Sequence, residues 1–550
     1  MLDLMKLSST TANTEQKRSA TGVSRQLVIF SCAALLLMWL LACAGGLNHP
    51  PGVRWVRLTA ACVVLAIGVL EYRRPWWGFC AFLMLWPQCV LIREQLCGFS
   101  ELWRALPDFQ CGPLAAALTL AYCARTSETR ADMIPQPVSG WTRALKAALW
   151  ILSASWLLST VLFYMRMLGS LPGWDINYQP LRFLLAPTAV SSLLPLRSLL
   201  NFLAPLLLGV VLLNDLAGGA GVPAGGRIEI RRESIYKWLV ASGSIVAIEA
   251  ILQMWCGWKP AFDVNPPGAP FGDRNVLAPV LVLTAAALFL WAQTMQSLTR
   301  KALAVLPGIV MLVTALLSGS RNGQLMVFAA LWLPLLIGGN WRRVAIGLAV
   351  VLAFVAAAFY APLPDPQAIR SDGPRRAIQS VVNLRAASWN ELTTYRTEIY
   401  EAALEVWWSN PALGSGPGTF VMLTSPTAKY NDFYKAHGYR PMHCHSVPLN
   451  LLAELGPLAA LAWLVLWVVF PLAILWRGGP ASGPALLALL IGAGNLVDAV
   501  WLQPSIATLS VLLLMVAAGT AKTGRRGDGV TGRNGTTGEH HSESCGAKVG

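Results

Sequence analysis

Apolar runs separated by short polar turns recur along the whole chain, and this pattern sets the expected architecture. A helix needs about 20 mostly apolar residues to cross a membrane, and such runs are clearest at 27–46, 276–292 and 344–360. We therefore expect an all-α polytopic membrane protein with about 12–14 transmembrane helices. Counting the runs predicts about fourteen spans, at roughly 27–46, 54–71, 75–93, 110–124, 146–164, 198–217, 237–256, 276–293, 302–318, 324–339, 343–360, 447–472, 484–501 and 503–519.

The spacing of the apolar runs divides the chain into five parts. Residues 1–25 and 521–550 are polar ends that we expect to be disordered on the cytoplasmic side. Transmembrane helices 1–11 occupy 26–360, and the C-terminal transmembrane helices occupy 447–520. The segment between them, 361–446, is too long for a simple connection and too aromatic for disorder. We expect it to be a large, partly helical periplasmic loop with a role in function.

Charge supports the membrane assignment and orients the chain. Only 13% of the 550 residues are charged and the mean hydropathy is +0.53, whereas soluble domains contain roughly 25% charged residues. The net charge of +15 comes largely from Lys and Arg in short loops, such as 226–234 and 522–527. Positive loops of multi-pass proteins face the cytoplasm, and this rule accounts for the net positive charge. We therefore expect membrane lipids around the protein and no nucleic acid as a partner.

Three arginines stand at the opposite membrane edge, where the positive-inside rule disfavours them. Arg274 precedes a span, Arg321 lies in a short turn between two spans, and Arg396 begins the helical stretch of the long loop. One isolated arginine is explained most simply by snorkelling to lipid phosphates. For three beside Gly, Ser and Asn turn residues we favour an anionic ligand, because the planar guanidinium fork binds phosphate oxygens bidentately.

Two histidines at the end of the long loop are the candidates for acid–base chemistry. His443 and His445 flank Cys444 just before an apolar helix, so they fit a metal site, a helix cap or a general base. A metal would need further ligands, and only His437 and Cys444 are near, so we expect no metal. Imidazole titrates near neutral pH and suits the deprotonation of a hydroxyl.

Two other features carry weaker signals. The segment 410–420, "NPALGSGPGTF", is glycine-rich like a phosphate loop but lacks the GK[ST] ending. A tight turn explains it better than nucleotide binding. Cys97 and Cys111 flank one outer loop, which leaves open a disulfide in an oxidising compartment.

Four segments, in this order, resemble the bacterial O-antigen ligase and O-antigen polymerase superfamily. The first is similar to the family's Asn-containing start of a middle span, the second to its Ser-Arg-x-Gly turn, the third to its arginine-led helix and glycine loop, and the fourth to its His-led helix. They are "FGDRNVLAPVLVL" (271–283), "LLSGSRNGQLMVF" (316–328), "RTEIYEAALEVWWSNPALGSGPGTF" (396–420) and "HSVPLNLLAELGPLA" (445–459). The resemblance covers roughly 270–460; there is one departure, since Ser446 stands where the family usually has Asn.

The resemblance implies a metal-independent, inverting glycosyltransferase without a cofactor. Its donor would be an undecaprenyl-diphosphate-linked glycan and its acceptor a lipid A-core or another glycan hydroxyl, at the periplasmic face of the bacterial inner membrane. By analogy the arginines hold the diphosphate and stabilise the leaving group, a histidine activates the acceptor, and three residues support them. These residues are Arg274, Arg321 and Arg396 for the diphosphate, His445 or His443 as the base, and Asn275, Tyr395 and Glu454 as supporting residues.

Several alternatives stay open at the level of sequence. An O-antigen or exopolysaccharide polymerase would use another lipid-linked unit as acceptor, and a protein O-oligosaccharyltransferase would use a protein hydroxyl. A membrane transporter is the alternative of another class. The apolar runs contain few acids or lysines to relay ions and show no inverted repeat, which disfavours transport.

Overall fold

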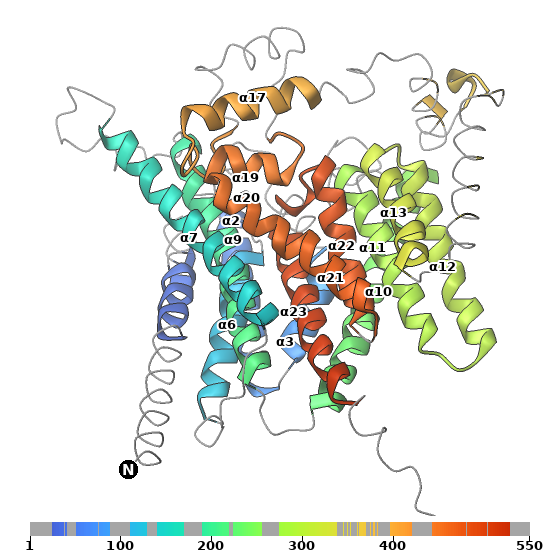
Figure 1. Cartoon of the computed structure of the whole chain (residues 1–550), viewed down its shortest axis with the longest axis horizontal. Helices are drawn as coiled ribbons and strands as arrows, with labels where there is room; N and C mark the ends of the chain where they lie inside the picture. The colour runs from blue at the N-terminus through green and yellow to red at the C-terminus, as the bar shows by residue number, and fades with distance from the viewer. Residues whose placement is uncertain are drawn as a thin grey trace, which may run out of the picture.

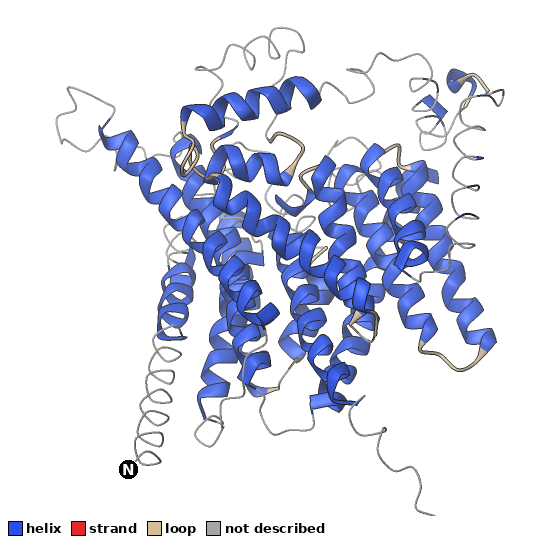
Figure 2. Cartoon of the chain, viewed as in Figure 1, coloured by secondary structure: helices blue, strands red, loops and turns tan. Residues whose placement is uncertain are grey.

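The computed structural model is a bundle of helices joined by turns (Figure 2). Its described residues contain no strand, and the all-α polytopic class is confirmed. The structure describes residues 25–37, 39–40, 51–74, 76–87, 111–128, 140–169, 190–218, 224–255, 274–337, 364–369, 396–420, 443–479, 481–502 and 504–527, with other isolated residues between 345 and 382.

The N-terminal part of the bundle consists of long helices that pack side by side (Figure 1). They are α2 (Pro51–Arg73), α3 (Trp77–Leu85), α6 (Cys111–Glu128), α7 (Gly140–Gly169), α9 (Val190–Gly218), α10 (Ala224–Trp255), α11 (Arg274–Gln293), α12 (Leu298–Leu317) and α13 (Arg321–Ile337).

The C-terminal part adds shorter helices, two of which lie across one end of the bundle. We call this end, which carries α17 and α19, the upper end, after its place in Figure 1. The elements are η2 (Pro366–Ala368), α17 (Arg396–Ser409), α19 (Val447–Leu455), α20 (Pro457–Leu464), the π-helix η4 (Val465–Val469), α21 (Phe470–Arg477), α22 (Ser482–Val497), η5 (Val500–Leu502) and α23 (Pro504–Gly527).

Five helical segments in the described part are long and apolar enough to cross a membrane. They are Gly140–Met165, Glu233–Met254, Arg274–Gln293, Leu298–Leu317 and Pro457–Arg477. Shorter apolar helices cover Arg25–Leu37, Asn201–Asn214, Ser482–Val497 and Pro504–Gly519. The protein is therefore multi-pass, and all of these helices coincide with predicted spans.

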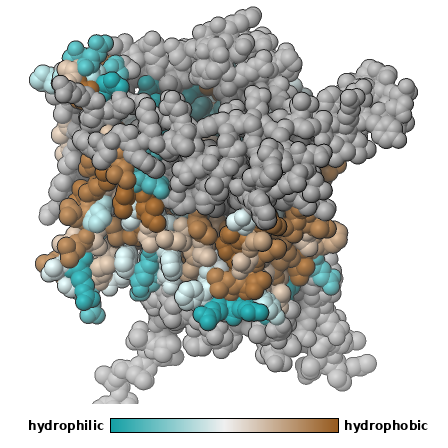
Figure 3. Space-filling model, turned by 180° about the vertical axis from the view of Figure 1, so that it is seen from behind, coloured by the Kyte–Doolittle hydropathy of each residue, from teal (hydrophilic) through white to brown (hydrophobic). Residues whose placement is uncertain are grey.

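Burial separates central helices from peripheral ones. In the most apolar stretch of α11, 78% of the residues are buried, against 28% in α12. The outer side of α12 exposes Leu303, Leu306 and Ile309. Figure 3 shows hydrophobic residues gathered across the middle of one face, with hydrophilic residues along its lower edge. Such a large apolar surface requires lipid around it.

The structure corrects one predicted span. The apolar run at 447–472 was expected to be a single helix, but it breaks at Gly456, which has φ 87°. Gly456 also lies against another segment, because a Cβ there would be 2.2 Å from the Ala412 carbonyl oxygen. Pro457 then starts a separate helix, since it has no N–H to continue the hydrogen-bond ladder of α19. As a result α19 lies with α17 at the upper end, and only Pro457–Arg477 is a span.

Some predictions fall outside the described residues. Cys97 is among them, so the disulfide to Cys111 stays a prediction. Most of the loop at 361–446 and of the predicted span at 343–360 also lies outside the described part.

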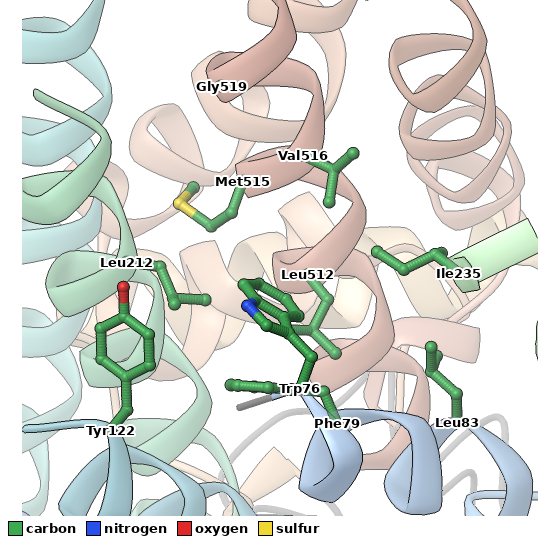
Figure 4. Close-up of a pocket in the computed structure, with 10 residues that line it drawn as sticks. All are labelled: Trp76, Phe79, Leu83, Tyr122, Leu212, Ile235, Leu512, Met515, Val516 and Gly519. Carbon is green, nitrogen blue, oxygen red and sulfur yellow. The ribbon is translucent and has the colours of Figure 1, made fainter. Parts of the chain in front are cut away.

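A cavity between α3, α6, α9, α10 and α23 lies far from the upper end (Figure 4). Its lining is almost wholly apolar and includes Trp76, Leu212 and Met515. Met515 stands eleven residues into α23, about 16 Å along a helix that begins at the upper end. This cavity contains none of the predicted site residues.

Two glycines with similar positive φ angles test how tightly loop 410–420 is packed. Gly414 (φ 65°) would place a Cβ 2.2 Å from the Glu454 carbonyl carbon, whereas Gly478 (φ 71°) has nothing within 4 Å. We expect Gly478→Ala to cost about 2 kcal/mol from backbone strain alone, because φ 71° with ψ −169° is a conformation that essentially only glycine adopts. Gly414→Ala should cost roughly 3 kcal/mol or more, because the loop must also move. Thermal unfolding of both variants in detergent measures the difference, and equal melting temperatures would contradict this packing.

Candidate active site

A small core of its own joins α17 to α19. Ile399, Ala402, Ala403 and Val406 form one side of α17, since they recur at helical spacing, and all are at most 3% exposed. They pack with Phe420, Cys444 and Ala453 in a cluster separate from the main core. This contact places the first residue of α17 beside the turn that precedes α19.

The glycine-rich loop after α17 is locked to the far end of α19. The Glu454 carboxylate accepts hydrogen bonds from the backbone N–H groups of Gly418 and Phe420, each at 2.9 Å. Gly416 N–H donates to the Glu454 carbonyl, and so does the Ser159 hydroxyl of α7. The converging amides that made this loop look like a phosphate loop therefore hold an internal carboxylate. The predicted tight turn is observed.

Glu454 is buried at this junction, and burial is the main reason that its pKa rises to about 7, although the two N–H donors lower it. It follows His445 by nine residues, or about 13 Å of helix. The structure thus places Glu454, which was predicted as a supporting residue, at the contact between the glycine-rich loop and the end of α19, away from the histidines.

The turn at 443–446 has a strained backbone. His445 adopts φ 53°, a conformation that non-glycine residues rarely adopt. The turn is held by the Asn450 side chain, which accepts from Cys444 N–H at 3.3 Å, and by the Tyr400 hydroxyl, which donates to the His445 carbonyl at 3.4 Å. Burial raises the pKa of the Cys444 thiol, and its Sγ donates to the Ser446 carbonyl, so Cys444 is a structural residue. Strain of this kind persists where surrounding contacts fix a functional side chain.

Asp498, in the turn between α22 and α23, joins the two predicted groups. Its Oδ1 lies 3.1 Å from His445 Nδ1 and its Oδ2 lies 3.4 Å from Arg396 Nη2. Arg396 also donates to the Val497 carbonyl, and Ala499 N–H donates to Asp498 Oδ1 at 2.8 Å. Asp498 is only 3% exposed. A cation from α17 and an imidazole from the turn before α19 therefore meet on one carboxylate of the bundle.

The charge state of Asp498 sets the role of each histidine nitrogen. Burial would raise its pKa, but the His445 hydrogen bond and the positive charge of Arg396 outweigh that and hold the pKa below its usual value. An ionised carboxylate only accepts hydrogen bonds. His445 Nδ1 must then carry the proton, and Nε2 is left as the basic nitrogen.

The Asp498 turn is itself supported from below. The Asn495 side chain donates to the Ile491 carbonyl and accepts from Trp501 N–H. The Trp501 ring is stacked on Phe202 and contacts Trp467 in the main core. The turn is thereby anchored to the membrane bundle.

The three predicted arginines are brought together at the upper end. Burial lowers the pKa of the Arg321 guanidinium, and the positive charges of Arg396 and Arg274 lower it further. The Ser320 hydroxyl donates to Asn275 Oδ1 at 3.0 Å and so ties the Arg321 turn to the start of α11. Asn275 thus supports the cluster from behind. Asp498 pairs with Arg396, and the three guanidinium groups lie close enough for the charges of Arg396 and Arg274 to act on Arg321, so positive charge is concentrated here.

His443 lies beside His445, with ring centroids 4.6 Å apart. Burial, together with the neighbouring His445, lowers its pKa to about 4, so it is neutral at pH 7. Its Nδ1 accepts from the His445 backbone N–H at 3.3 Å. The structure thus gives the two histidines different environments, which the sequence left open.

The pair also raises the question of a metal. His443, His445 and Asp498 offer ligand atoms within 4.8 Å of one another. Both Asp498 oxygens already have donors, however, and a metal would have to displace the Arg396 guanidinium among like charges. The contacts of Asp498 with His445 and Arg396 therefore favour the hydrogen-bonded arrangement over a metal site.

Tyr395 and Asp498 differ in what the sequence and the structure say of them. Tyr395 lies outside the described residues, so its role stays a prediction. Asp498 was not predicted from the sequence. A signal was present, however, since Asp498 is a lone acid in the apolar stretch "GAGNLVDAVWL". An ionisable residue in such a stretch is by default a functional candidate.

Comparison with known families identifies part of the chain. Residues 306–464 match the family model described as O-antigen ligase (Wzy_C). The superfamily resemblance drawn from the sequence is confirmed. The match includes Arg321, Arg396 and His445, while Arg274 and Asp498 lie outside it. None of the curated proteins matches the chain.

The arginine cluster can be tested without any glycan. We expect pyrophosphate to raise the melting temperature of the wild type, because ligands that bind only the folded state stabilise it. Arg321→Gln should lose this shift while its melting temperature without ligand changes little. Arg300→Gln, an exposed arginine at the start of α12, is the matched control and should keep the shift. An equal shift in both variants would contradict an anion site at Arg321.

Proposed function

We propose that the protein is an O-antigen ligase-like glycosyltransferase that moves a glycan from undecaprenyl diphosphate to a hydroxyl of a lipid A-core. The observation that carries this proposal is the meeting of His445, Asp498 and Arg396 beside two further arginines. The site therefore combines a positioned base with three neighbouring guanidinium groups. These are the two groups needed to activate a hydroxyl and to bind a diphosphate leaving group.

Apolar side chains below the arginines are compatible with a lipid-linked donor. They surround a void of about 10 Å³ and lie five to nine residues from the site residues on the same segments: Val280 and Leu283 after Arg274, Met326 after Arg321, and Ile491 before Asp498. A diphosphate held by the arginines would thus have an apolar surface next to it. An amphiphile with an anionic head and an apolar tail matches this arrangement better than a nucleotide sugar does.

The proposed reaction proceeds by direct displacement. His445 Nε2 takes the proton of the acceptor hydroxyl while its oxygen attacks the anomeric carbon of the donor sugar. The bond from that carbon to the diphosphate breaks, and configuration inverts because attack comes from the opposite face. Asp498 stabilises the imidazolium that forms, and Arg274, Arg321 and Arg396 stabilise the charge on the departing diphosphate.

Metal independence is part of the proposal. Arginines supply the positive charge that a divalent cation would otherwise bring to a diphosphate. The predicted absence of a metal or other cofactor is therefore compatible with this chemistry.

The acceptor and the membrane side belong to the proposal as well. A polymerase would present another lipid-linked unit to the same base, and a protein O-oligosaccharyltransferase would present a serine or threonine. The charge of the loops favours a location in the bacterial inner membrane with the upper end in the periplasm. Transport is disfavoured, because the polar cluster lies at one end of the bundle and not at its middle.

Activity of single variants tests the roles of the histidines. With purified protein, synthetic lipid-linked donor and lipid A-core acceptor, His445→Ala and Asp498→Asn should each lower the transfer rate by roughly 10²-fold or more. His443→Ala should lower it less than His445→Ala does. In Asp498→Asn the amide can donate to Nδ1, which would put the proton on Nε2 and remove the base.

The matched control is Asp365→Asn, an exposed aspartate that accepts from Gln367 N–H in η2, and its rate should stay near that of the wild type. EDTA should leave the rate unchanged. Full activity of His445→Ala would sink the mechanism, and loss of activity in EDTA would revive a metal at His443, His445 and Asp498. Replacing the lipid A-core by a second lipid-linked unit distinguishes a ligase from a polymerase.

Labelling of single cysteines tests the membrane side. In a background without other reactive cysteines, Ser409→Cys on α17 should react with a membrane-impermeant maleimide added outside the inner membrane. Gln296→Cys, in the exposed turn between α11 and α12, should react only after the membrane is opened. The reverse pattern would overturn the proposed orientation.

A further inference from the structure

The outer face of α17 carries an exposed aromatic surface that the proposed reaction does not use. The inner face of this helix, from Ile399 to Val406, is buried against α19. Trp408 follows Ile399 by nine residues, or two and a half turns, and therefore lies on the opposite side. Its side chain is 70% exposed, and Leu404 beside it is 38% exposed. Trp408 and Leu404 thus form an exposed apolar patch on the outer face of α17, and contiguous patches of this kind can mark binding surfaces.

The position of α17 indicates whether its outer face contacts lipid or the space beyond the upper end of the bundle. Figure 1 shows α17 as the outermost labelled helix at the upper end, lying across the bundle above α19. Since its buried face points towards the bundle, Trp408 points away from it. Aromatic residues of a membrane-interface belt lie around the sides of a bundle at headgroup level. Trp408 faces outwards from the end of the bundle, so lipid is not its expected contact.

The surroundings of Trp408 suit a carbohydrate. Trp407 packs against it with ring centroids 4.7 Å apart, and Trp407 Nε1 donates to the Pro411 carbonyl at 3.1 Å, which fixes the pair. Glu405 stands about one turn and Glu401 about two turns before Trp408 on the same helix. An aromatic ring stacks on the C–H face of a sugar, and carboxylates accept hydrogen bonds from its hydroxyls. The same carboxylates disfavour an anionic lipid surface.

The helix also links this surface to the reaction centre. Arg396, at the first position of α17, belongs to the proposed diphosphate site, and Trp408 lies twelve residues further on, about 18 Å along the axis. We propose that the outer face of α17 around Trp408 is a sugar-binding platform for glycan units several residues away from the diphosphate. This proposal rests on the proposed function and extends it, because it makes the protein select donors by the length of their glycan.

The test compares two donors that differ only in their glycan. One carries a single sugar on the lipid diphosphate and the other a chain of several repeat units. For the long donor, Trp408→Ala should raise KM about tenfold, which corresponds to the loss of one aromatic contact, with kcat kept. Trp408→Phe should recover part of the affinity, because it retains a ring. For the single-sugar donor, which does not extend to Trp408, KM should equal that of the control variant.

The control variant is Trp476→Ala, since Trp476 is 91% exposed near the end of α21, away from the site. An equal KM of Trp408→Ala and Trp476→Ala for the long donor would overturn the platform, and so would an equal rise for both donors. If the wild type transfers neither donor, the proposed function fails on its own. Calorimetric titration with the free glycan then decides the platform: binding that Trp408→Ala abolishes supports it, and binding that is unchanged or absent from the wild type overturns it.

Discussion

The carboxylate of Asp498 is the contact on which the arrangement of the site depends. It is nearly fully buried, and a buried charge without partners costs several kcal/mol. Its partners come from three separate segments: Arg396 from α17, His445 from the turn before α19, and the backbone of its own turn. Asp498 thus links α17 to the bundle at the upper end, while α19 is also held by Val447, Leu451 and Leu455, which pack in the main core. Removing it would free the histidine and leave Arg396 among like charges.

A second buried carboxylate, Glu454, holds the frame of the same site. It accepts two backbone N–H groups of the glycine loop, and the close approach of Gly414 and Gly456 allows that loop to lie directly on the end of α19. The result is a rigid connection behind the strained His445 turn. A strained conformation lasts only when its surroundings determine it fully. The glycine loop thus holds α17 and α19 in one register, and this is how it would contribute to the proposed reaction.

The polarity of the upper end is graded from the membrane outwards. Apolar side chains of α11, α13 and α22 line a cavity, the three arginines lie above it, and the histidines and Asp498 complete the cluster. Beyond them, α17 extends from Arg396 to Trp408. A lipid-linked glycan has the same order of apolar, anionic and sugar parts. Both the proposed reaction and the proposed platform follow from this one match between ligand and protein.

The sequence by itself determined the features that leave a local signal. The spans follow from the length of apolar runs, the three arginines from their place on a side that disfavours them, and His443 and His445 from the chemistry of imidazole. The domain match confirmed the family to which these motifs pointed. The break at Gly456 had a signal in its Gly-Pro pair, but the continuous apolar run concealed it. Asp498 stands 53 residues from His445, and nothing local in the chain says which acid meets which histidine. That pairing, and with it the difference between the two histidines, was decided only by the tertiary structure, because it depends on how α22, α17 and α19 pack together.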